Sequence, residues 1–134
     1  MSARRKATGR QPEQLTITVC RGCCCGNSAE HPSVDAAAQL ARLRAGVAGH
    51  ARIRVTDCLD VCEMSNVLIV SPSPAAREAG ARAVWLGRVL ADSTIDDVVA
   101  WALAGGPGRA EPPVGVEVSS FAPARRVREA GEAG

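Results

Sequence analysis

Aromatic side chains are scarce in this chain: it has no tyrosine, and only Trp85, Trp101 and Phe121 carry aromatic rings. Valine, leucine and isoleucine must therefore supply most of the buried apolar surface. The length of 134 residues suits one domain with a single hydrophobic core.

Long apolar runs and a dominant charge are missing as well. No stretch approaches the roughly 20 apolar residues of a membrane-spanning helix. Basic residues at 4–6 are not followed by the apolar segment of a secretory signal. The formal net charge is only +2, from 16 basic and 14 acidic residues. We therefore expect a soluble cytoplasmic protein that inserts into no membrane and binds no nucleic acid.

Fingerprints of catalysis are absent too. The sequence contains no phosphate-binding loop, no flavin or nicotinamide fingerprint and no nucleophile paired with a base. The chain is therefore expected to transform no substrate of its own and not to be an enzyme.

What the chain does have is six cysteines in two short stretches. The first, residues 19–26, reads VCRGCCCG, and the second, residues 57–63, reads DCLDVCE. In a reducing cytoplasm, clustered thiols usually bind metal or carry out redox chemistry rather than form structural disulfides. The function is therefore expected where the two stretches meet.

Hydrophobic periodicity predicts how they meet. Residues 14–20 and 51–57 alternate apolar and polar side chains, as strands do. Between them, a helix is expected from Ser33 to about Gly46. Such a strand–helix–strand unit makes its two strands parallel, so Cys20 and Cys58 are expected at the same edge of the sheet.

Two further strands are expected at 67–70 and 84–89, and a second helix ends at about residue 104. The result is an α/β domain over 14–104, with a mixed sheet of four to five elements flanked by two helices, one on each face. Its order, β-α-β-β-β-α, resembles the thioredoxin-like fold. Residues 1–13 are expected to form a flexible arm and residues 105–134 a flexible tail, because neither shows a periodic apolar face.

Three interpretations of the cysteines compete. The spacing of Cys20 and Cys23 is that of a thiol–disulfide oxidoreductase, although the predicted helix begins too late to activate the pair. A structural zinc module would also use four thiolates. Its two ligand pairs usually both have the spacing CxxC, and the CxxxC spacing of Cys58 and Cys62 fits this less well. A two-iron cluster would take Cys58 and Cys62, together with Cys20 and one of the three cysteines that follow.

The spacing CxxxxC from Cys20 to Cys25 and CxxxC from Cys58 to Cys62, followed by the apolar run 67–70, resembles the thioredoxin-like [2Fe-2S] ferredoxins. The same pattern occurs in the related small [2Fe-2S] subunit of respiratory complex I. The resemblance implies that Cys20, Cys25, Cys58 and Cys62 bind a [2Fe-2S] cluster, with Cys24 as the alternative to Cys25.

The resemblance also implies a role and partners. The protein would be a one-electron carrier that exchanges electrons with protein redox partners, and it would form a homodimer. Apart from the resemblance, Arg21 next to Cys20 is expected to be a mostly solvated side chain, and beside a cluster its positive charge would favour the added electron.

Overall fold

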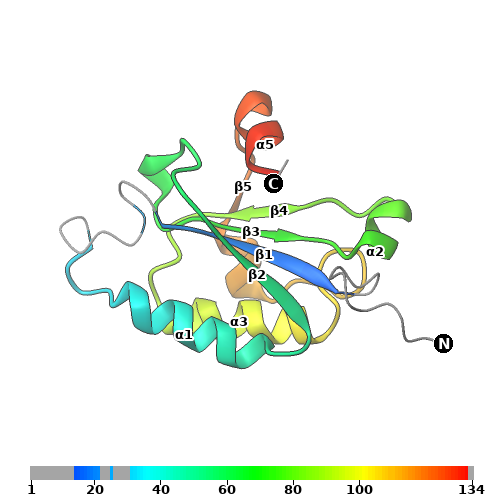
Figure 1. The fold of residues 1–134 in the computed structure, drawn as a ribbon, viewed down its shortest axis with the longest axis horizontal. Helices are drawn as coiled ribbons and strands as arrows, with labels where there is room; N and C mark the ends of the chain where they lie inside the picture. The colour runs from blue at the N-terminus through cyan, green and yellow to red at the C-terminus, as the bar shows by residue number, and fades with distance from the viewer. Residues whose placement is uncertain (1–13, 22–24, 26–30, 133–134) are drawn as a thin grey trace.

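The structure is a computed structural model, and it describes residues 14–21, 25 and 31–132. Its centre is a five-stranded sheet with the order β2-β1-β3-β4-β5 (Figure 1). The strands are β1 (Leu15–Cys20), β2 (Ala51–Thr56), β3 (Leu68–Ser71), β4 (Val84–Leu86) and β5 (Ser120–Phe121). Strands β1 and β2 are parallel, and each of the other neighbouring pairs is antiparallel. The expected mixed α/β sheet is confirmed.

Five α-helices and one short 3₁₀ helix accompany the sheet in the described residues. The helices are α1 (Ala36–Val47), the 3₁₀ helix η2 (Cys62–Met64), α2 (Pro74–Glu78), α3 (Asp92–Leu103), α4 (Val114–Ser119) and α5 (Arg125–Glu132). The two helices expected from the sequence correspond to α1 and α3. No helix in the described part of the chain has the length and apolar character needed to cross a membrane.

Helix α1 begins and ends at different residues from those expected. Its N-cap is Asp35, not Ser33, because the Asp35 carboxylate accepts a hydrogen bond from the Ala38 amide at 2.9 Å. Gly46 does not end the helix but lies inside it. A Cβ atom at Gly46 would lie 2.7 Å from both γ-carbons of Val99, so the glycine permits close approach of α1 and α3.

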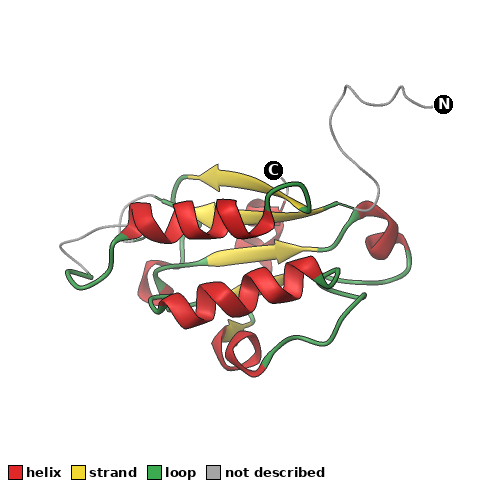
Figure 2. Cartoon of the chain, turned by 90° about the horizontal axis from the view of Figure 1, so that it is seen from below, coloured by secondary structure: helices red, strands yellow, loops and turns green. Residues whose placement is uncertain are grey.

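Helices α1 and α3 lie on the same face of the sheet (Figures 1 and 2). The expectation that one helix covers each face is therefore wrong. The reason lies in β1, where Leu15, Ile17 and Val19 all belong to one buried core that includes residues of both helices. These helix residues are Leu43, Val47, Ile95, Val98, Trp101 and Ala102. Both amphipathic helices pack where the sheet offers this apolar face.

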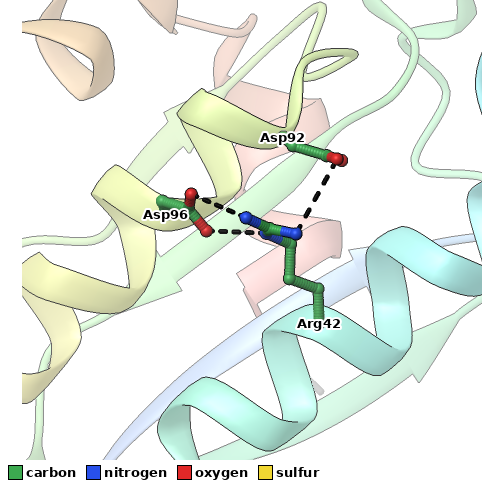
Figure 3. A network of polar contacts seen from close by, with 3 residues as sticks. All are labelled: Arg42, Asp92 and Asp96. Atoms are coloured by element: carbon green, nitrogen blue, oxygen red, sulfur yellow. Dashed lines mark hydrogen bonds and ion pairs between the residues drawn. The ribbon is translucent and has the colours of Figure 1, made fainter.

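A polar contact also joins the two helices on their exposed side (Figure 3). The Arg42 guanidinium donates two hydrogen bonds to the Asp96 carboxylate, at 2.7 and 2.9 Å, and its Nη1 lies 3.8 Å from an Asp92 oxygen. The hydrogen bond from Arg42 lowers the pKa of Asp96, and the same bond raises the pKa of Arg42. The ionised pair is therefore favoured in the folded protein.

This contact predicts a pH-dependent effect of Asp96→Asn. Because folding lowers the pKa of Asp96, the carboxylate stabilises the fold above its ordinary pKa near 3.8 and loses that effect as pH falls through the folded value. The variant is expected to be slightly less stable than wild type at pH 7 and equal to it well below pH 3.8. Urea unfolding at both pH values checks this, with Glu111→Gln as the exposed control. A difference between wild type and Asp96→Asn that persists at low pH would contradict the assignment.

Residues 105–134 differ most from the expectation of a tail without regular structure. They contain α4, β5 and α5, and β5 adds a strand beside β4 through the pair Trp85 and Phe121. The two rings meet edge to face with centroids 6.1 Å apart. The sequence hides this arrangement because the only residues that α5 buries are Val127 and Gly131, four residues apart among charged side chains. So few apolar residues produce no periodic signal.

Candidate metal centre

Cys20 and the loop of Cys58 lie at the same edge of the sheet, as the parallel strands predict. Cys20 ends β1 and pairs in register with Thr56, which ends the parallel strand β2. The Cys20 side chain is buried, and its Sγ lies 3.5 Å from the carbonyl oxygen of Asp57. Cys20 therefore reaches the residue that directly precedes Cys58.

Cys25 lies in the same buried environment as Cys20. Its exposed fraction is only 6%, and it belongs with Cys20 to an apolar cluster on the sheet face opposite α1 and α3. The other members of this cluster are Leu59, Val61, Val67, Ile69, Ala83, Trp85 and Val127. Two of the four proposed ligands are thus gathered in a site shielded from water.

Cys58, in contrast, is exposed, and its sulfur accepts a hydrogen bond from the Asp60 amide at 3.2 Å. Asp60 has a φ of +67°, in the left-handed region that few residues other than glycine, asparagine and aspartate adopt readily. Amide hydrogen bonds to cysteine sulfur are among the interactions that set the potential of iron–sulfur sites. The turn at Asp60 supplies one here.

The remaining candidate residues lie partly outside the described structure. Cys23 and Cys24 are outside the described residues, and Cys62 is described only by its backbone, at the start of η2. In the described part of the chain, no three His, Cys, Asp or Glu side chains are grouped as metal ligands. The described geometry thus brings Cys20 and Cys25 together next to the loop of Cys58, and it leaves the choice between Cys24 and Cys25 open.

Arg21 is half-buried beside the cysteines. Its guanidinium donates to the carbonyl oxygens of Cys20, at 2.8 Å, and of Ala36, at 3.2 Å. Burial lowers the pKa of Arg21, while the negative charge of ionised Cys25 and Cys20 acts in the opposite direction. The sequence suggested a mostly solvated side chain here. In the structure, two hydrogen bonds to carbonyl oxygens hold the Arg21 guanidinium near Cys20 and Cys25.

Comparisons with protein-family models, curated proteins and solved structures found no match.

His31 links the two cysteine-bearing loops. Its Nε2 lies 2.9 Å from the hydroxyl oxygen of Ser65, a hydrogen bond whose direction depends on the histidine tautomer. His31 follows the first cysteine stretch in the chain, and Ser65 follows Cys62. The two residues lie 34 positions apart in the sequence, so only the folded chain brings His31 to Ser65.

Helix α5 also contacts the second cysteine loop, which the sequence did not indicate. A Cβ atom at Gly131 would lie 2.5 Å from Trp85 and 3.2 Å from Leu59, so the helix backbone lies directly against both residues. Arg126 of the helix lies 3.6 Å from the Asp60 carboxylate, an exposed ion pair of little energetic weight. A hollow of about 180 Å³ between Cys58 and α5 remains open.

Proposed function

We propose that this protein holds one [2Fe-2S] cluster and acts as a one-electron carrier with a thioredoxin-like fold. The observation that carries the proposal is the position of Cys20 at the end of a strand parallel to the one that leads to Cys58, with Cys25 in the same buried cluster. Two thiol-bearing loops that face each other are the usual support of a two-iron cluster. The helix–strand order of residues 15–103 supports the choice of fold.

In this proposal Cys20, Cys25, Cys58 and Cys62 supply the thiolates, and Cys24 is the alternative to Cys25. When bound, the cluster supplies one-electron oxidation and reduction. The apolar side chains around Cys20 and Cys25 exclude water, and the Asp60 amide donates to the sulfur of Cys58. Exposed Cys58 marks the side from which a protein redox partner can approach. We further propose a homodimer in the cytoplasm, where clustered thiols stay reduced.

The decisive experiment is purification without oxygen, followed by assays of iron, zinc and acid-labile sulfide and by a visible spectrum. The expected result is about two iron and about two sulfide per chain, together with visible absorption that is partly bleached by dithionite. A colourless protein with stoichiometric zinc would contradict the proposal and indicate a structural zinc module. A metal-free protein with a reducible Cys20–Cys23 disulfide would indicate a thiol–disulfide oxidoreductase. Light scattering tests the homodimer separately.

Arg21→Gln is expected to make the reduction potential more negative by tens of millivolts. Removing the positive charge beside Cys20 and Cys25 disfavours the added electron, and about 59 mV corresponds to a tenfold change in a one-electron equilibrium. The measurement is a spectroscopic redox titration of the cluster-loaded protein.

The matched control is Arg44→Gln, which removes an exposed arginine from α1. Arg21→Lys retains the charge but loses the planar guanidinium that donates to both Cys20 and Ala36. If Arg21→Lys and Arg21→Gln shift the potential equally, the effect comes from altered loop geometry rather than from charge.

A further inference from the structure

A second concave region, which shares Arg54 with the hollow beside Cys58, is built from polar residues of three adjacent strands. Thr16 of β1 pairs in register with Arg52 of β2 on one side and with Ser71 of β3 on the other. Residues paired across neighbouring strands project from the same face of a sheet. One row of the sheet thus carries a guanidinium and two hydroxyls, on the face opposite Leu15 and Ile17.

Two more arginines come from the next pair of residues on the same sheet face and from helix α2. Arg54 pairs in register with Thr18, and Arg77 belongs to α2. Together with Thr16, Ser71 and Arg52, these residues line a groove of about 270 Å³. Three guanidinium groups from two different elements therefore surround one hollow, with hydroxyl groups on its floor.

The charges in this groove are poorly balanced. Its one acidic side chain, Glu132, accepts hydrogen bonds from Trp85 Nε1 at 2.7 Å and from Arg128 at 3.2 Å. Arg54 donates to the carbonyl oxygen of Gly131, at 3.3 Å, which is a neutral acceptor. Within the described residues, no carboxylate forms an ion pair with Arg52 or Arg77.

A second hollow, of about 330 Å³, continues this basic surface. It shares Arg77 and Glu132 with the first groove and adds Arg82 and Arg128. The two hollows together contain five arginines and one glutamate, although the net charge of the whole chain is only +2. The residues that line the two hollows therefore carry more positive than negative charge.

We propose that these adjoining hollows bind a diphosphate-bearing small molecule, with one phosphate between Arg52, Arg54 and Arg77. Guanidinium groups bind phosphate through paired, charge-assisted hydrogen bonds, and hydroxyls on the groove floor donate further bonds. The second phosphate reaches the adjoining hollow, because both hollows share Arg77. The proposal does not depend on whether the cysteines hold a cluster.

The test is calorimetric titration of the full-length protein with inorganic pyrophosphate in about 0.15 M salt, where surface charge effects are screened beyond about 8 Å. Saturable binding is expected. The double variant Arg52→Gln/Arg77→Gln is expected to weaken it at least about tenfold, a change of about 1.4 kcal/mol. Acetate at the same concentration is expected not to compete, because it offers a single carboxylate.

The matched control is Arg44→Gln/Arg125→Gln, which removes the same net charge from two exposed arginines elsewhere. Equal weakening in both double variants would show a nonspecific charge effect and overturn the proposal. Failure of pyrophosphate to saturate would also overturn it. Binding of poly-glutamate without binding of pyrophosphate would overturn it in favour of an acidic protein surface as the ligand.

Discussion

A Cys58→Ser variant is expected to purify without the cluster's visible absorption and with its iron content reduced to background. The serine hydroxyl is a harder and far less acidic ligand than a thiol, so it replaces a cluster thiolate poorly. Cys58 is exposed, and its replacement removes no side chain from the apolar core. Loss of iron would therefore reflect loss of a ligand and not damage to the fold. Iron and sulfide assays on protein purified without oxygen measure the effect.

Cys23→Ser is the matched control, because it makes the same chemical change at a cysteine that is not among the proposed ligands. It is expected to retain iron and colour at wild-type levels. Should Cys23→Ser lose the cluster while Cys58→Ser retains it, the assignment of ligands would be wrong.

The choice between Cys24 and Cys25 has its own test. Cys25→Ser is expected to lose the cluster and Cys24→Ser to keep it, because Cys25 shares a buried apolar environment with Cys20. The opposite result would identify Cys24 as the ligand. Far-UV circular dichroism of both variants checks that the fold is retained, since Cys25 is a core residue.

Val127→Asp is expected to lower the free energy of unfolding by about 2–3 kcal/mol. Val127 is 7% exposed and is the main apolar contact of α5 with the sheet. A carboxylate there would be buried without a partner, or the helix would leave the sheet and expose the apolar side chains beneath it. Urea unfolding of the metal-free, reduced protein, followed by tryptophan fluorescence, measures the change.

Val118→Asp is the control for this substitution. It places the same charge on α4, at a valine that is 79% exposed, and is expected to change stability by less than about 0.5 kcal/mol. If the two aspartate variants unfold at the same urea concentration, α5 contributes nothing to the fold. In that case residues 125–132 would behave as the tail that the sequence suggests.

Much of the sheet could be predicted because its strands carry simple patterns. The alternation in β1 marks the strand although both of its faces are largely buried, and the apolar run in β3 reflects burial on both faces. The face of the sheet on which α3 packs could not be predicted. The pattern of an amphipathic helix shows that one of its own faces is buried, but it does not show which face of the sheet covers it. Helix α5 was missed for a related reason, since it buries only one valine and one glycine, and its hydrogen bond from Trp85 goes to the charged residue Glu132.

The candidate site was predictable to the extent that it depends on chain topology. A parallel strand pair brings Cys20 to the loop of Cys58 whatever the other side chains are. The burial of Arg21 and the contact of His31 with Ser65 were not predictable in this way. Both depend on how loops of irregular conformation pack, and residues 34 positions apart meet in the second case.

The two faces of the sheet are completed by parts of the chain that are synthesised at different times. The core beneath α1 and α3 consists almost entirely of residues 15–102, so it can form while the chain is still being made. The opposite face needs Val127 and Glu132 to cover Trp85. A nascent chain that ends before α5 therefore exposes Trp85 and the apolar cluster around it, which includes Cys20 and Cys25. Chaperones are expected to bind this intermediate, and its cysteines are expected to be open to premature oxidation.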